Sequence, residues 1–317
     1  MKKCKEQFCR CFIQRANTSF ELLEGTIREK EHEIRSHYVG TIVSSISSDD
    51  FVTMIVVDGT FILEYFLRHS NPHLVENDPM IEHWMHPILK FDLALLENQL
   101  PLFVLDMLLK QANPPAELGL KPLSLMELAF KFFECYNFQM VALVDIFGKI
   151  EHFTDLVRLF YLGGNLPDRE VGGAKLSYFA TQLREAGVKL KGVKFDETIG
   201  YFADRRSQRI DIGHVGHVGL RRWFLDLRFL PQVVVDRLRL NELMKAQRGY
   251  RRFLDIRFNN GVLEIPCITL NDERIRLIRN IIALEQSSHY VGHAYVTDFF
   301  VFLGFLIDTS KDVDFLI

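Results

Sequence analysis

The stretch LALLENQLPLFVLDMLL, residues 93–109, places three polar residues between two apolar runs. Proline suits the first turn of a helix and disfavours helical geometry at the residue before it, so Pro101 predicts that one helix ends and another begins here. Glu97, Asn98 and Gln99 would then supply hydrogen-bond partners for backbone groups at the two helix ends, with Asn98 as the N-cap. We favour this structural role over a catalytic role for Glu97.

Helical periodicity recurs along most of the chain. Apolar residues on one face predict a helix over 19–39, which starts with a capping box at Thr18, and another over 47–68. In the second helix Asp58 falls on the apolar stripe, next to Gly59. A buried carboxylate must be paired, protonated or functional. We favour close helix packing at Gly59, with an arginine from another segment paired to Asp58.

Strand patterns occur only in the C-terminal half. Residues 188–195 alternate in part, and residues 253–270 predict a hairpin whose turn is formed by Asn260 and Gly261, since an Asn-Gly pair adopts the positive φ angles of a tight turn. Pro266 predicts that its strand lies at a sheet edge or carries a bulge. The expected fold class is mainly α, a multi-helix globular domain with a small antiparallel β element near 252–270.

Composition sets further limits. The net charge of −3 argues against nucleic acid as a partner, although residues 181–260 carry 17 basic against 9 acidic residues. Five cysteines, an odd number, favour a reduced intracellular protein over a disulfide framework. The longest apolar run, 299–307, is shorter than the roughly 20 residues that span a bilayer. We therefore expect a soluble intracellular chain.

Several landmarks, in this order along the chain, are similar to the signature blocks of the plant domain-of-unknown-function 247 family. They are VVDGTFILEYF (56–66), LLENQLPLFVLDML (95–108), YFATQLREAGVKLK (178–191), FLDIRFNNGVLEIPCITLNDE (253–273), IIALEQ (281–286) and DTSKDVDFL (308–316).

This resemblance implies a mainly helical protein without an established general activity. Family members usually carry a membrane helix near the C-terminus, and some grass members act in self-recognition between pollen and pistil. The chain lacks the proline-rich N-terminal block of the family and ends before the membrane anchor. We therefore expect residues 1–317 to form a single partial family domain, in which residues 205–250 are an insert or a loop region.

The sequence contains no catalytic signature. It has no phosphate-binding loop, nucleophile elbow or dinucleotide-binding glycine pattern. The histidine pair His289/His293 has the i,i+4 spacing of a zinc protease, but HYVGH contains Gly292 and no carboxylate, so we expect neither metal nor cofactor. The favoured function is non-catalytic protein interaction or recognition, as the resemblance implies. An enzyme whose site is assembled from distant residues, such as Asp58 or Glu97 with a histidine, stays open.

A second alternative is a binder of anionic ligands through the basic segment 181–257. The arginines that would contact phosphates or acidic lipid head groups are Arg205, Arg206, Arg209, Arg221 and Arg222.

A final expectation concerns residues 298–307, DFFVFLGFLI, which predict a helix capped by Thr297. Apolar residues occupy every side of this helix, whereas a helix at a domain surface needs only one apolar stripe. Part of it should therefore stay exposed and favour self-association, an unknown protein partner or a membrane surface.

Overall fold

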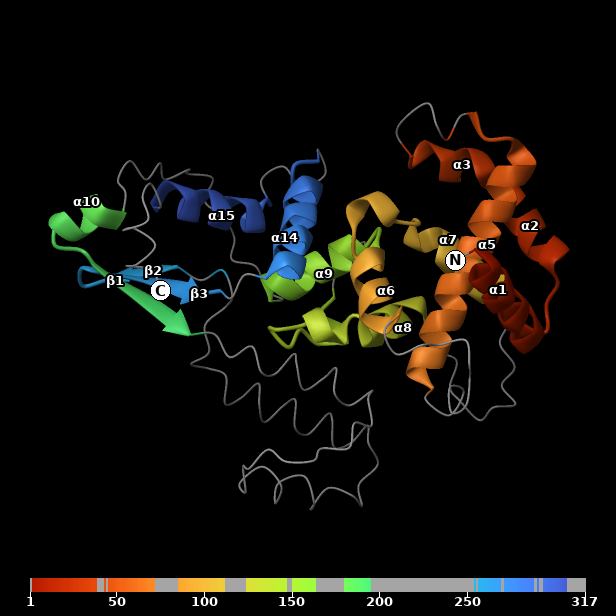
Figure 1. Ribbon diagram of the computed structural model, residues 1–317, viewed down its shortest axis with the longest axis horizontal. Helices are drawn as coiled ribbons and strands as arrows, with labels where there is room; N and C mark the ends of the chain where they lie inside the picture. Colours follow the sequence, from red (N-terminus) through yellow and green to blue (C-terminus); the bar gives the residue numbers. More distant parts are fainter. Residues whose placement is uncertain are drawn as a thin grey trace, which may run out of the picture.

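A computed structural model shows an elongated, mainly helical chain with a small sheet at one end (Figure 1). The mainly α prediction is therefore confirmed. The residues that the structure describes are 2–38, 43, 45–71, 85–111, 124–146, 150–163, 180–194, 254, 256–268, 271–287, 290 and 293–306. The predicted insert 205–250 and its arginines lie outside them.

The N-terminal helices assemble around one long central helix. They are α1 (Lys2–Ala16), α2 (Phe20–Glu29), α3 (Glu31–Ser36) and α5 (Ser48–Ser70). Helix α5 packs against α1 and α2. It begins after Ser47, whose hydroxyl accepts a hydrogen bond from the Asp50 amide, as the polar start of the predicted second helix indicates.

The predicted helix 19–39 is wrong in two details. Its N-cap is Ser19, whose hydroxyl accepts from the Leu22 amide, one residue after the predicted Thr18. The helix also breaks at Lys30, where the backbone leaves helical geometry (φ −112°, ψ 9°), so the segment forms α2 and α3.

The middle of the chain supplies shorter helices that close the core. They are α6 (Met85–Leu93), η2 (Leu96–Asn98), α7 (Leu102–Gln111), α8 (Leu125–Phe132), η4 (Glu134–Tyr136), η5 (Leu143–Asp145) and α9 (Phe153–Leu162). Helices α7 and α8 pack on α5. Aromatic rings fill the centre, where Phe66 of α5 lies 4.5 Å from Phe132 and 5.4 Å from Phe153 between ring centroids.

The sheet has three strands in the order β1-β3-β2. Helix α10 (Ala180–Glu185) precedes β1 (Lys189–Lys194), while β2 (Arg257–Asn259) and β3 (Val262–Cys267) form the predicted hairpin. Asn260 and Gly261 have φ angles of 50° and 75°, as the turn requires. Strand β1 adds in parallel to β3, so the sheet is mixed.

The prediction that Pro266 lies in an edge strand or at a bulge is wrong, because β3 is the central strand and its register with β1 runs without offset through Pro266. The Lys189 amide donates to the carbonyl of Gly261, just before β3. Because backbone groups alternate along a strand, odd-numbered residues of β3 direct theirs toward β1 and even-numbered residues, including Pro266, direct theirs toward β2. The last pair with β2 is Arg257 with Glu264, two residues earlier, so within the described strands the missing amide removes no ladder hydrogen bond.

Two helices complete the described chain, α14 (Asp272–Glu285) and α15 (Tyr295–Leu306). Helix α15 joins two apolar clusters: Val296 belongs to the main core, and Leu306 packs with Leu263 and Ile265 of β3. The helix begins before the predicted 298–307, and Thr297 is not its cap.

None of the helices in the described ranges is long and apolar enough to cross a membrane.

Candidate functional site

Gln99 links two helix ends inside the stretch 93–109, and we call such a contact, in which one polar side chain bonds two elements, a joint. Its amide nitrogen donates to the carbonyls of Leu93 (2.8 Å) and Leu95 (2.6 Å), at the end of α6, and its amide oxygen accepts from the Phe153 amide (2.8 Å), the first residue of α9. One side chain thus satisfies backbone groups of two helices that are distant in sequence. The predicted structural role of the polar stretch holds, and Gln99 carries most of it.

The neighbouring residues differ from prediction. Asn98 is not an N-cap, because its side-chain amide donates to the Asp92 carbonyl at 3.1 Å and so serves the helix that ends. Glu97 is exposed, in η2. Pro101 directly precedes α7, and the first amide of that helix, on Leu102, donates to the Glu151 carbonyl at 2.9 Å.

A second joint surrounds Glu64 of α5, whose side chain is fully buried. The Arg15 guanidinium of α1 binds both carboxylate oxygens, at 2.8 and 3.1 Å, and the Arg68 guanidinium binds one at 2.7 Å. The hydrogen bond with Glu64 raises the pKa of Arg15. Since a buried carboxylate is stable only when paired, Arg15 fixes α1 against α5, and Arg68 completes the pairing from within α5.

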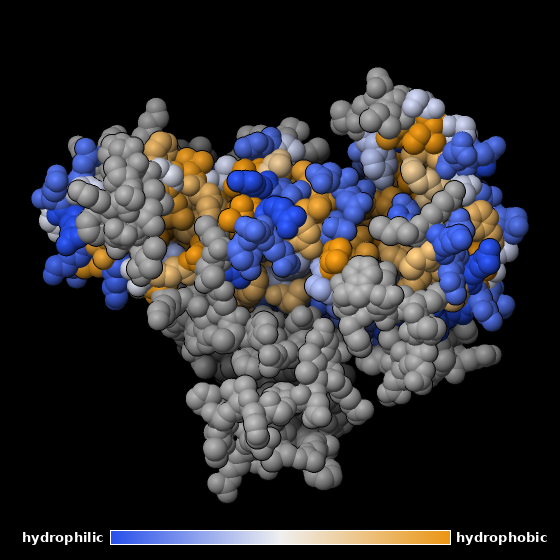
Figure 2. All heavy atoms as spheres, viewed as in Figure 1, coloured by the Kyte–Doolittle hydropathy of each residue, from blue (hydrophilic) through white to orange (hydrophobic). Residues whose placement is uncertain are grey.

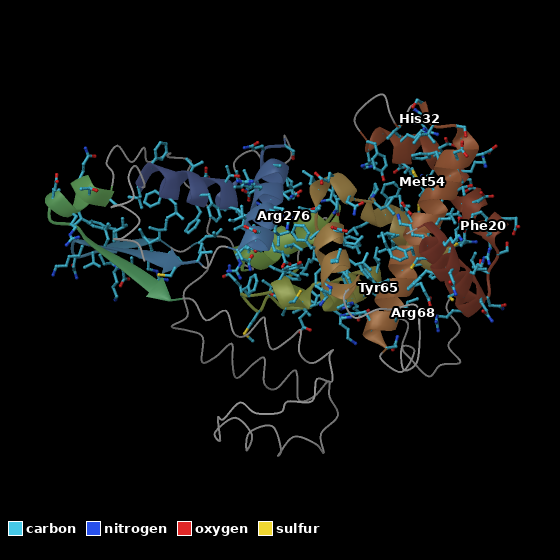
Figure 3. The ribbon with its side chains drawn as sticks, in the orientation of Figure 1. Phe20, His32, Met54, Tyr65, Arg68 and Arg276 are labelled. Atoms are coloured by element: carbon cyan, nitrogen blue, oxygen red, sulfur yellow. The ribbon has the colours of Figure 1, made fainter. Side chains whose placement is uncertain are left out.

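An aromatic and histidine cluster lies one helical turn away on α5. The Tyr65 hydroxyl is 2.7 Å from His86 Nδ1 of α6, and burial raises the pKa of this tyrosine, so the hydroxyl keeps its proton. The His86 ring lies 4.7 Å from the His69 ring, and both rings meet Phe132 edge-on. Figure 3 shows Tyr65 together with Arg68 along the same part of α5.

The third joint is a fully buried carboxylate at the end of α14. Glu285 accepts from the Arg158 guanidinium of α9 at 2.8 Å and from the Thr297 amide and hydroxyl at 2.7 and 2.8 Å. The Val296 amide adds a longer bond of 3.3 Å. Glu285 therefore caps the N-terminus of α15, where a carboxylate is favoured by the unpaired amides and the helix dipole. Thr297 is a donor to this cap.

A tyrosine reinforces the third joint. The Tyr290 hydroxyl donates to Asp155 at 2.5 Å, and Arg158 lies 4.6 Å over the Tyr290 ring. Burial, followed by the bond to Asp155, raises the pKa of Tyr290. The segment between α14 and α15 is thereby tied to α9 by charge-assisted contacts.

Asp58 is neither buried nor paired with an arginine. Its side chain is 34% exposed and its carboxylate binds the Lys5 ammonium of α1 at 2.7 Å. Gly59 does mark a close helix approach, since a Cβ there would lie 2.4 Å from a Leu108 methyl of α7. Asp58 lies at the edge of the buried face of α5, so its predicted burial is wrong.

The remaining predicted positions fall into two groups. Asn260, Gly261 and Pro266 build the small sheet and lie away from the three joints (Figure 1). The five arginines of the anion-binding hypothesis, Arg205, Arg206, Arg209, Arg221 and Arg222, lie outside the described residues.

Possible metal ligands and cysteine thiols can be located among the residues that the structure describes. These residues contain no group of three or more His, Cys, Asp or Glu side chains placed to hold a metal ion. Cys9 is buried, and burial raises the pKa of its thiol, which disfavours the reactive thiolate. Cys135 lies partly buried against the main core.

Sequence reasoning missed Glu64, Glu285 and their arginines. Both acids interrupt apolar runs, in FILEYF and IIALEQ, and an acid within such a run is a usable signal of a buried pair. Their partners could not be found, because Arg158 and Glu285 are 127 residues apart.

Comparison with known proteins finds a matching family model and a curated relative. The family model described as "Plant protein of unknown function", DUF247, matches residues 1–218 and 237–317. UPF0481 protein At3g47200 of Arabidopsis thaliana is 26% identical over 309 residues, an alignment that covers 93% of this chain and 54% of the relative. The chain thus spans about half the length of that relative. No solved structure matches significantly.

The central residues of the three joints, Gln99, Glu64 and Glu285, lie in sequence blocks that carry the resemblance, and the family model covers most of the chain. The chain belongs to the DUF247 family of plant proteins of unknown function.

Proposed function

We propose that the protein is a non-catalytic interaction protein that recognises another protein through an apolar surface on α15. The observation that carries the proposal is the pair Val301 and Phe305, which are 48% and 50% exposed although both are large and apolar. They are four residues apart and so share one face of the helix. Hydrophobic residues gather over α15 in Figure 2.

Gly304 strengthens the case. A glycine inside a helix costs about 1 kcal/mol relative to alanine, and a Cβ at Gly304 would meet nothing within 4 Å. Intrachain packing in the described residues thus gives no reason for it. Its position beside Phe305 would let a partner approach the helix backbone closely.

The buried charges point the same way. Glu64 and Glu285 are fully buried and engaged by fixed arginines and backbone amides, which suits a rigid framework. An acid that transfers protons must instead reach a substrate. The self-recognition of grass relatives, implied only by resemblance, would fit a protein that presents a binding face.

The test compares matched surface variants. Val301→Asp with Phe305→Asp should abolish binding of a hydrophobic dye and lower capture of plant-extract proteins by the immobilised chain. Val144→Asp, at an exposed valine of η5, makes the same chemical change elsewhere and should leave both unchanged. Equal dye binding and equal capture by all three proteins would contradict the proposal.

One observation favours the anion-binding alternative. The strand register places Lys189, Lys191 and Arg257 on one face of the sheet, around Glu264, which pairs with Lys191 at 3.0 Å. Binding to vesicles that contain acidic lipids, with affinity that falls steeply as salt rises, would support this function, since exposed charge contacts are screened.

A further inference from the structure

Two half-buried histidines meet where α5, α6 and α8 come together. The rings of His69 and His86 lie 4.7 Å apart, inclined by 30°, and each lies edge-on to Phe132 of α8. Tyr65 holds His86 from the side through its hydroxyl. A charge gained by either ring would therefore sit beside the other ring and beside aromatic carbon.

The charged groups that act on this site are cations from each packed helix. Lys90 of α6 is 5% exposed, with its ammonium 5.8 Å over the Phe132 ring, and Lys131 of α8 donates to the Ser70 carbonyl at 2.8 Å. The nearest buried carboxylate on α5, Glu64, is bound by two arginines.

Burial is the main cause of a low pKa of about 3 for His69, and the charges of His86, Lys90 and Lys131 lower it further. A hydrogen bond with the Lys131 backbone opposes this shift. An unfolded histidine has a pKa of about 6.5. The closed state is the one in which His69 is packed, and the open state is the one in which it is exposed to water. Below pH 6.5 His69 binds a proton in the open state but not in the closed state, so acid favours opening.

We propose that His69 and His86 form an acid-sensitive latch: proton uptake by His69, beside the His86 ring, releases α6 from α5 and α8.

Helix α6 is suited to local release. Its 9 residues are fewer than the roughly 12–15 that an isolated helix needs, so it depends on packing. Release would return the buried Lys90 ammonium to water and uncover Leu89 and Leu93, which are 8% and 6% exposed. The latch would therefore present new apolar surface at low pH, separate from the surface on α15.

Hydrogen exchange of the intact chain tests the proposal. Exchange rates of α6 amides, corrected for the intrinsic effect of pH, are compared with those of α14 at pH 7.5 and 5.5. At pH 5.5, one unit below its pKa of about 6.5, His69 is mostly protonated in the open state. We therefore expect about a tenfold loss of protection from exchange in α6 between pH 7.5 and 5.5, and no change in α14. His69→Phe, which keeps an aromatic ring, should reduce this change to about twofold or less.

The control is His32→Phe, at an exposed histidine of α3 far from the latch in Figure 3, which should behave as the original chain. His69→Gln serves the same purpose as His69→Phe if the larger ring destabilises the fold. An α6 to α14 ratio that does not vary with pH would overturn the latch. So would an acid response that persists in both His69 variants, or one that affects α6 and α14 equally.

Discussion

Replacing Gln99 by alanine should destabilise the protein by about 2–4 kcal/mol. The change removes three hydrogen bonds, of 2.6 to 2.8 Å, and leaves the amide of Phe153, a residue that is 1% exposed, without its partner. Three net hydrogen bonds at about 0.5–1.5 kcal/mol each sum to about 1.5–4.5 kcal/mol, and the unsatisfied Phe153 amide excludes the lowest part of that range. The free energy of unfolding in urea measures it.

Two further variants sharpen the test. Gln99→Glu keeps an acceptor for the Phe153 amide but turns an oxygen toward the carbonyls of Leu93 and Leu95, so it should destabilise at least as much as alanine. Glu97→Ala, at an exposed residue two positions earlier, should cost less than about 0.5 kcal/mol. Equal costs at the two positions would refute the assignment of the joint to Gln99.

Other replacements test the packing. Glu64→Gln should cost about 3–5 kcal/mol in urea unfolding, because it leaves two arginines uncompensated, whereas Glu33→Gln in an exposed pair should cost less than about 0.5 kcal/mol. Gly59→Ala should lower the melting temperature, since its Cβ would lie 2.4 Å from a methyl of α7, whereas Gly25→Ala in open space should raise it. Gly261→Val, at φ 75°, should cost about 1 kcal/mol or more; unchanged thermal stability would count against the turn.

Local features of the fold were predictable from the sequence. The Asn-Gly turn depends on neighbouring backbone angles, and the start of α5 depends on one serine and the residues that follow it. The break near Gln99 follows from a proline and from the need to satisfy helix ends. The turn, the helix start and the helix break each depend on interactions within a few residues. Sequence patterns over a short window can therefore predict them.

Long-range pairing was not predictable. The sequence does not specify that Asp58 meets Lys5, 53 residues away, or that Gln99 reaches the first amide of α9. The parallel addition of β1 next to β3 likewise placed Pro266 in a central strand. These arrangements depend on which helices and strands become neighbours in the fold. A single sequence carries no direct record of those neighbours.

Glu64 and Glu285, the buried acids of the signature blocks, hold the helical framework together through their ion pairs. A double-mutant cycle between Glu285 and Arg158 tests it most directly, with Glu285→Gln, Arg158→Met and the double variant compared by urea unfolding. Each single variant leaves a buried group uncompensated, so we expect a coupling free energy of at least about 2 kcal/mol. A coupling below about 0.5 kcal/mol, with single variants as stable as the original chain, would contradict the account.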